Sequence, residues 1–304
     1  MTLLDPEAVV RAEGPWTHRA VPANGARFHV AEMGEGPLVL LLHGFPTFWW
    51  AWRRTLPALA AAGYRAAAMD LRGYAGSDHP PRGYDPFTLS ADVTGVIRSL
   101  GERHAIVVGH GWGAFLAWTC AVVHPEAIRA IAPVSMPHPR RMRAAMVGDA
   151  AQRRAWGYVY GFQVPATPER DLLEDSAAQV GQLLRRWSAT PDWPDPQTEA
   201  TYRAAMLLLN TSHCALEYHR WALRSVPRPD GIRFARRMKD PIWAPVLHVQ
   251  GGSDPTVLPS SARGSEVYVQ GPYRWAELAG CGHFPHEEQP EEFHALLLDW
   301  LSEV

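Results

Sequence analysis

Four short segments of this 304-residue chain combine glycine with side chains that can move protons or support attack on carbon. They are HGFP at 43–46, GHGWGA at 109–114, GGSD at 251–254 and GCGHFP at 280–285. A carboxylate such as Asp254 can orient a histidine such as His283, and the histidine can then act as a general base. The segments therefore predict the base half of a hydrolytic site, provided that the fold brings them together.

The second segment has the form of a strand-turn-helix nucleophile elbow, with small residues on both sides of a central position. Glycine, Gly111, stands at that centre. The backbone of an elbow is strained at positive φ, which costs a residue other than glycine on the order of 1 to 3 kcal/mol. We therefore expect Gly111 to keep the turn while supplying no nucleophile.

Short apolar runs predict the buried parallel strands that would position these segments. The runs lie at 38–42, 65–69, 104–108, 128–134, 246–249 and 273–278. Nearly continuous apolar strands separated by helix-length segments are typical of a parallel sheet covered on both faces. The four segments fall where predicted strands end, which is where open α/β sheets place their sites. Residues 16–32 alternate around Asn24-Gly25 and predict an antiparallel hairpin at the sheet edge.

Residues 139–230 lack this alternation of short apolar runs and helix-length segments. They are rich in Arg, Trp and Tyr, and prolines break their helix-length stretches. We expect a helical lid inserted into an α/β core that is formed by residues 1–138 and 231–304. A last helix is predicted to begin at Pro290.

Composition narrows the classes of function. A formal net charge of −2 without long Lys or Arg runs disfavours nucleic acid and anionic membranes as partners and favours a small molecule. The absence of a signal-like segment or of an 18-residue apolar run predicts a cytoplasmic protein. Cys120, Cys214 and Cys281 are too scattered for a disulfide framework or a zinc site, so we expect reduced thiols, no metal and no cofactor. Both a monomer and a homodimer are compatible with the sequence.

The order elbow, acid, histidine is that of α/β-hydrolases. HGFP, DLRGYAGSD at 70–78, the elbow and the late Asp254 and His283 resemble the epoxide-hydrolase and haloalkane-dehalogenase branch over nearly the whole chain. The resemblance implies an α/β-hydrolase fold, with a mostly parallel eight-stranded sheet and a helical lid. Asp70 and Asp78 are expected to brace turns.

The resemblance also assigns roles to residues of the site. It implies that Asp254 orients His283, that His283 activates water, and that the amides of Phe45 and Trp112 form an oxyanion hole. In that branch the central elbow residue is an aspartate that attacks carbon, and this position falls on Gly111.

Epoxide hydrolases of the branch also use two lid tyrosines that donate a proton as the ring opens. The spacing of Tyr158 to Gln163 resembles the first, and a phenol with a pKa near 10 suits a strongly basic alkoxide. The second position falls on His219, with Tyr218 one residue before it. Neighbouring helical side chains point about 100° apart, so Tyr218 cannot substitute without a shift of the helix. We expect Phe45, Trp112, Tyr218 and His219 to contact the substrate.

The resemblance implies that the ligand is a small apolar epoxide or a related molecule. Three interpretations of the site are compatible with glycine at the elbow. The protein binds its ligand without turnover, because losing a nucleophile typically costs roughly 10⁴ to 10⁶ in rate. Alternatively, His283 and Asp254 activate water directly, for hydrolysis or for proton transfer without hydrolysis. In the third, His110 or Ser135 supplies a replacement nucleophile. A distant alternative is a dinucleotide-binding turn at GHGWGA, although the GxGxxG spacing is missing.

Overall fold

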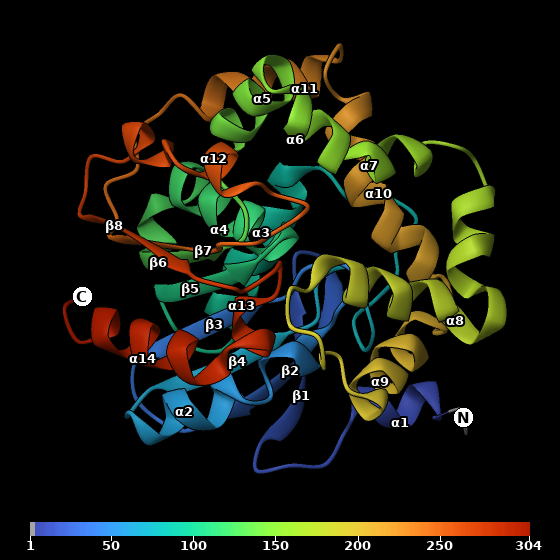
Figure 1. The fold of residues 1–304 in the computed structure, drawn as a ribbon. Coiled ribbons are helices and arrows are strands. Elements are labelled where there is room, and N and C mark those ends of the chain that lie inside the picture. The colour runs from blue at the N-terminus through green and yellow to red at the C-terminus, as the bar shows by residue number, and fades with distance from the viewer. Residues whose placement is uncertain (1–3) are drawn as a thin grey trace.

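The computed structural model describes residues 4–304, and within them the strands form one eight-stranded sheet in the order β1-β2-β4-β3-β5-β6-β7-β8 (Figure 1). The strands are β1 (Thr17–Ala23), β2 (Ala26–Met33), β3 (Leu38–Leu42), β4 (Arg65–Met69), β5 (Ala105–His110), β6 (Ile128–Val134), β7 (Val246–Gly251) and β8 (Tyr273–Leu278). β2 runs antiparallel to β1 and β4, and the other neighbours pair in parallel. The predicted α/β sheet is confirmed.

The sequence patterns explain most of these strands. Every residue of β3 and β5 is buried, as expected for strands covered on both faces. The β1–β2 hairpin turns at Asn24 and Gly25, whose φ angles of 46° and 75° are the positive pair that a two-residue hairpin requires. The end predicted for β5 was wrong, because Gly109 and His110 still pair with Pro133 and Val134 of β6. Backbone pairing thus extends this strand beyond its apolar run.

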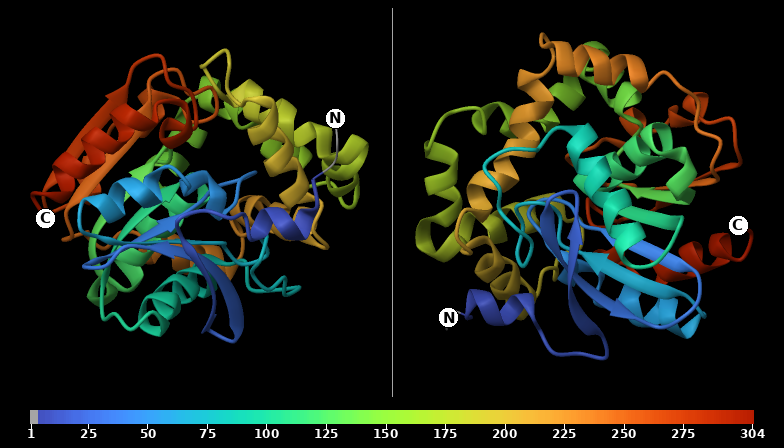
Figure 2. Two further views of the ribbon diagram at one scale, coloured as in Figure 1. Left: turned by 90° about the horizontal axis from the view of Figure 1, so that it is seen from below. Right: turned by 180° about the vertical axis from the view of Figure 1, so that it is seen from behind.

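Helices cover both faces of the sheet (Figure 1). α2 (Thr55–Ala61) and α14 (Pro290–Leu301) lie on one face, and α3 (Pro86–Ser99) and α4 (Trp112–Val123) lie on the other. β1 and β8 are the two edge strands of the sheet, and Figure 2 shows the sheet and its helices from two further sides. The shorter helices are α1 (Pro6–Val10), η1 (Trp49–Trp52), η2 (Pro125–Ala127), α12 (Pro259–Ala262), η3 (Ser265–Tyr268) and α13 (Pro285–Glu288).

The chain between β6 and β7 is helical and arches over the carboxyl ends of the strands (Figure 1). Its helices are α5 (Pro139–Gly148), α6 (Ala150–Ala155), α7 (Gly157–Gly161), α8 (Thr167–Trp187), α9 (Pro196–Met206), α10 (Thr211–Arg224) and α11 (Pro229–Arg237). α8 is kinked at Glu174–Ala177, where the backbone leaves helical geometry. The lid boundary predicted at residue 230 falls inside α11, and the division into core and lid stays a prediction.

The described residues include three cysteines, all buried and unpaired. Within residues 4–304 no group of three or more His, Cys, Asp or Glu side chains is arranged to hold a metal ion. Nor does any helix of that range combine the length and the apolar character needed to cross a membrane.

Several histidines are buried in this fold. Burial lowers the pKa of His138, His219 and His248 to about 3. Such a group stays neutral in the folded protein, whereas in the unfolded chain it takes up a proton below a pH of about 6.5. Since the unfolded state then binds more protons, stability is lost as the pH falls from about 6.5 towards 3.

We therefore predict that His248→Phe flattens the pH dependence of stability. His248 is buried on β7, where its Nδ1 lies 3.0 Å from the hydroxyl of Tyr273. Between pH 6 and 4.5 the free energy of urea unfolding should fall with decreasing pH in both proteins. The fall per pH unit should be smaller in the variant than in the parent, by about 1.4 kcal/mol. His104→Gln, at an exposed position, is the control and should leave the slope unchanged. Equal slopes for His248→Phe and the parent would contradict the prediction.

Candidate active site

The loops after β7 and β8 bring Asp254 and His283 together. His283 Nδ1 lies 2.7 Å from Asp254 Oδ2, and both side chains are buried. An ionised carboxylate can only accept, so Nδ1 carries the proton and Nε2 is left as an acceptor. Asp254 also accepts from Gln250 Nε2 at 3.0 Å and from the amides of Thr256 and Val257 at 2.8 and 3.0 Å. The carboxylate is therefore fixed in position, and the histidine is held with an acceptor nitrogen that can take up a proton.

Thr256 belongs to this group, although sequence reasoning did not identify it. Its Oγ1 lies 2.9 Å from Asp254 Oδ1 and 2.9 Å from His283 Nδ1. The hydroxyl can donate to the carboxylate and accept from the imidazole at the same time. The signal was present in the sequence, because an Asp followed two residues later by Thr is typical of a turn in which the Asp side chain bonds the backbone ahead.

Glu288 holds the loop that carries His283. Its carboxylate accepts from the amides of Gly282 and Phe284, each at 3.0 Å, which are the residues on either side of the histidine. The same carboxylate accepts from the amide of Ala189 at 2.9 Å, in the segment between α8 and α9. In addition, the amide of His283 donates to the carbonyl of Trp187 at 2.8 Å. The histidine loop is thus tied to the helical segment above the sheet.

Gly111 occupies the turn between β5 and α4 at φ 53° and ψ −114°. A Cβ added there would lie 3.6 Å from Gly44 Cα and 3.7 Å from His283 Nε2, which are ordinary contact distances. The flanking glycines differ, because a Cβ on Gly109 would collide with the Gly113 carbonyl and a Cβ on Gly113 with the Leu42 carbonyl. Packing therefore requires glycine at 109 and 113, whereas position 111 has room for a side chain that faces the base.

A small cavity lies beside Gly111 and His283. Its lining residues are Phe45, Gly111, Trp112, Met136, Trp156, Tyr158, Trp187, His219, Thr256, Val257 and His283. It offers about 20 Å³ to the centre of a water-sized sphere. An ordered water needs roughly 10 to 15 Å³ and two or more polar partners, so the cavity can hold at least one water next to the base. Met136, Trp156 and Trp187 were not predicted from the sequence, since no motif marks them.

The two amides that the resemblance assigns to an oxyanion hole border this cavity. Phe45 follows β3, and Trp112 is the first residue of α4, where a helix leaves its N–H groups unpaired. Neither amide donates a hydrogen bond to another group of the described chain. Both are available to a developing negative charge.

Tyr158 on α7 also reaches the cavity. Its ring packs 5.0 Å from that of Trp187, and within residues 4–304 its hydroxyl has no hydrogen-bond partner. Burial raises the pKa of Tyr158 above its usual value near 10, and the negative charge of Asp254 raises it further. The phenol thus stays protonated and can donate to a basic oxygen.

His219 lines the cavity on α10, but its acceptor nitrogen is engaged. The indole Nε1 of Trp112 donates to His219 Nε2 at 3.1 Å, so the proton of the neutral ring must lie on Nδ1, which is 3.2 Å from the Ala215 carbonyl. Burial lowers the pKa of His219 to about 3, which keeps the ring neutral. In this arrangement His219 positions Trp112 and has no proton to give to a ligand.

Tyr218, which was expected to contact the substrate, does not line the cavity. Tyr218 points away from the cavity, and its buried hydroxyl donates to the Arg72 carbonyl at 2.8 Å. The cause is the helical geometry of α10, which turns successive side chains apart. Tyr218 instead packs against Tyr74 and Tyr84.

The two candidate replacement nucleophiles do not line the cavity. His110 donates through Nε2 to the His283 carbonyl at 2.8 Å, and Ser135 is buried at the end of β6. Asp70 and Asp78 brace turns as predicted, because Asp70 accepts from the amides of Trp49 and Gly76 and Asp78 from that of Arg27.

Comparison with known proteins identifies relatives of this fold. The family model of the alpha/beta hydrolase fold matches residues 37–290. Epoxide hydrolase A of Mycobacterium tuberculosis (strain ATCC 25618 / H37Rv) is 31% identical over 95% of this chain and 98% of its own length. The crystal structure of epoxide hydrolase A from Mycobacterium thermoresistibile has a TM-score of 0.82 at 29% identity and covers 94% of this chain and 98% of its own. An epoxide hydrolase from an endophytic Streptomyces has a TM-score of 0.80 at 31% identity, over 95% and 96%.

The elbow geometry makes a prediction about stability. Gly111→Ala meets no steric obstacle and should lose on the order of 1 to 3 kcal/mol of unfolding free energy, because φ is positive. Gly113→Ala must displace the backbone at Leu42 and should lose more than Gly111→Ala. Urea unfolding of both variants measures the difference, and an equal loss would contradict the packing argument.

Proposed function

Because the chain belongs to the α/β-hydrolase family and to its epoxide-hydrolase branch, we propose that it adds water directly to a small apolar epoxide, without a covalent intermediate. In this proposal His283, oriented by Asp254, is the general base, and Gly111 leaves the space for the water. The phenol of Tyr158 assists at the oxygen that leaves the ring carbon, and the amides of Phe45 and Trp112 donate to the oxygen of the attacking water.

The proposed reaction is a single addition. His283 Nε2 removes a proton from water as the water oxygen bonds to a ring carbon, and the carbon–oxygen bond of the epoxide breaks. Tyr158 donates its proton to the oxygen that is released, which completes a diol. The proton on His283 then returns to the Tyr158 phenolate through solvent, so the protein is restored and one water is consumed.

The space at His283 Nε2 is the observation that carries this proposal. A side-chain nucleophile would occupy it, as the 3.7 Å from a Cβ at position 111 to Nε2 indicates. With glycine there, the cavity has room for water beside the base. The oxyanion donors and the tyrosine do not depend on the nucleophile, and such residual elements can retain roughly 10³ to 10⁴ in rate over water.

Binding without turnover is the second candidate, and His219 favours it. The branch pattern expects two acids in the lid, whereas the acceptor nitrogen of His219 is bound to the Trp112 indole. One acid and no covalent nucleophile leave a site that could hold an epoxide without opening it.

Oxygen labelling separates the two candidates. We predict that the parent protein produces a diol that carries ¹⁸O in the first turnover. In this experiment the protein is in molar excess over an aryl or alkyl epoxide, and the solvent is H₂¹⁸O. His283→Ala should abolish this activity, because the water loses its base. A parent protein without activity on the whole panel would contradict direct water addition, and activity that survives His283→Ala would contradict the role of the base.

Restoring a carboxylate provides the complementary test. We predict that Gly111→Asp hydrolyses epoxides faster than Gly111→Ala, the control with the same backbone strain, by on the order of 10⁴. Its first-turnover diol in H₂¹⁸O should be unlabelled, since the oxygen then comes from the aspartate. If the parent is silent and Gly111→Asp is active, the protein is a ligand-binding relative that has lost its nucleophile. A labelled first-turnover product from Gly111→Asp would show that residue 111 does not attack.

A further inference from the structure

Charge is distributed unevenly over the helical segment between β6 and β7. Residues 139–155, which form α5 and α6, and residues 221–240, which end α10 and form α11, together contain eleven Arg and Lys but only three Asp and no Glu. The formal net charge of the whole chain is −2, so the rest of the chain carries an excess of acidic residues. The nearly balanced total therefore conceals one strongly cationic part.

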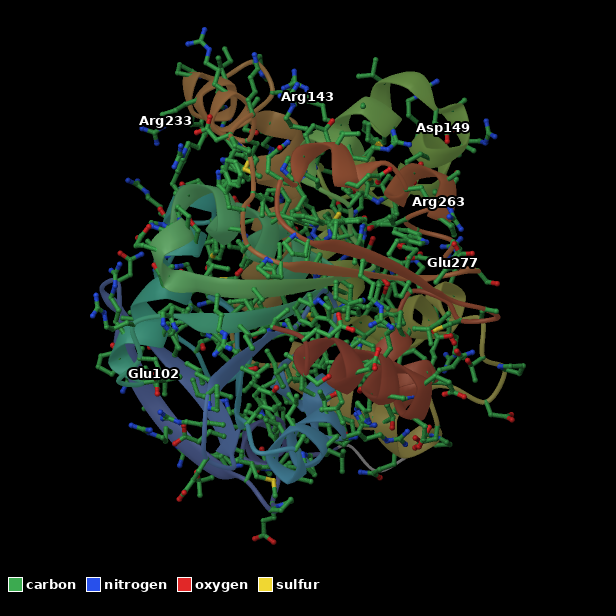
Figure 3. All side chains as sticks on the ribbon, turned by 90° about the vertical axis from the view of Figure 1, so that its left-hand side faces the viewer. Glu102, Arg143, Asp149, Arg233, Arg263 and Glu277 are labelled. Carbon is green, nitrogen blue, oxygen red and sulfur yellow. The ribbon has the colours of Figure 1, made fainter. Side chains whose placement is uncertain are left out.

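The cationic segments lie at one end of the molecule. α5, α6 and α11 lie together at the top of Figure 1, and Figure 3 shows Arg143 and Arg233 at that same end. A surface hollow between α5 and α11 is lined by four of the cations, which are Arg140, Arg143, Arg236 and Lys239.

These four cations have no internal partner of opposite charge. Within residues 4–304 none of them forms an ion pair, and no carboxylate lines the hollow. The three aspartates of the same segments are engaged elsewhere, Asp149 as the cap of α6, Asp230 with the Trp221 indole and Asp240 with Arg237. The four cations are therefore available to an external anion.

Exposed aliphatic side chains lie among the cations. Val147 on α5 is 77% exposed and Ile232 on α11 is 44% exposed, and both line the hollow. A nucleic acid duplex binds cations through its phosphates and presents no apolar layer to such side chains. An anionic phospholipid surface offers phosphates to the cations and the outer part of the acyl chains to the aliphatic groups. The combination of charges and aliphatic side chains therefore favours a lipid surface.

We propose that this face, formed by α5, α6 and α11, binds the surface of an anionic phospholipid membrane. The cations of the hollow contact the lipid phosphates, and Val147 and Ile232 insert among the head groups. The expectation against an anionic membrane rested on the total charge, in which these cations are cancelled by acidic residues elsewhere in the chain. Local clusters of charge, and not the total, determine attraction over the short distance that salt leaves unscreened.

This orientation directs the mouth of an apolar pocket towards the lipid. The pocket lies among α4, α5, α10 and α11, and its lining is mostly apolar. Arg140, Arg143 and Ala235 line both this pocket and the hollow. An apolar molecule dissolved in the membrane can then enter the pocket without crossing water.

Sedimentation with lipid vesicles tests the surface without relying on turnover. Vesicles of equal parts phosphatidylcholine and phosphatidylglycerol are compared with vesicles of phosphatidylcholine alone, at low and at high salt. The full-length protein should bind the anionic vesicles at low salt and about tenfold more weakly at high salt, because salt screens the cations. It should not sediment with the neutral vesicles. Equal binding to the two kinds of vesicle, or binding to neither, would overturn the proposal.

Charge reversal tests whether this face makes the contact. Arg143→Glu/Arg236→Glu should weaken binding to the anionic vesicles roughly thirtyfold. Arg143→Gln/Lys239→Gln serves the same purpose if the reversed variant fails to fold. The matched control is Arg103→Glu/Arg129→Glu, because both arginines are exposed at the amino ends of β5 and β6, on the side of the sheet away from the lid. A similar loss in the control would attribute binding to net charge and refute the assignment of this face.

The aliphatic side chains separate a lipid surface from other anionic partners. Val147→Ser/Ile232→Ser should weaken vesicle binding about tenfold, and unchanged binding would refute insertion of these residues. If the protein binds a DNA duplex through Arg143 and Arg236 but binds no vesicles, the face belongs to a nucleic acid and the proposal fails. It also fails if the same arginines mediate salt-sensitive self-association without vesicle binding, because the partner is then a second copy of this chain.

The vesicle experiments and the epoxide assays have independent outcomes. Vesicle binding without epoxide hydrolysis would contradict the proposed function alone. Hydrolysis without vesicle binding would contradict this inference alone.

Discussion

The hydrogen bond between Asp254 and His283 is the interaction on which the rest of the site depends. A buried carboxylate without partners would cost several kcal/mol, and Asp254 is buried with every oxygen supplied by donors from Gln250, Thr256 and Val257. Because the acid cannot turn, the proton of His283 stays on Nδ1 and the lone pair of Nε2 points at residue 111. The β7 strand, the loop after β8 and the Glu288 contacts all serve to fix the direction of that one lone pair.

The three glycines of the elbow are present for two different physical reasons, close backbone packing and relief of backbone strain. Gly109 and Gly113 are required by close backbone packing, whereas Gly111 could carry a side chain without collision. Relief of backbone strain is the one physical gain from glycine at 111, on the order of 1 to 3 kcal/mol, and it comes at the expense of a group facing the base. The turn at Gly111 thus leaves a space in front of His283 Nε2 that either water or a ligand can occupy.

The sequence predicted the sheet well because its strands are buried on both faces and leave continuous apolar runs. It also predicted that Asp254 and His283 lie together, because the order elbow, acid, histidine along the chain can be read directly from the sequence. It failed where tertiary contacts decide. The end of β5 follows from pairing with β6, and the orientation of Tyr218 follows from the packing of α10 beside Tyr74 and Tyr84. Thr256 was readable in principle, from its place two residues after Asp254. Met136, Trp156 and Trp187 were not, because apolar and aromatic side chains give no local sign of which cavity they will border.

The residue at 219 changes what the lid contributes. A tyrosine hydroxyl can donate to a ligand, but the neutral His219 accepts from Trp112 and thereby fixes the indole beside the small cavity. Together with Gly111, this reduces the chemistry available in the cavity to one oriented base, one tyrosine and two amides. Such a set suits a substrate whose own ring strain lowers the barrier to attack, because the protein then needs to supply only a positioned water and a proton for the leaving oxygen. Gly111 and His219, the two positions that differ from the branch pattern, are therefore the positions on which the proposed direct addition of water depends.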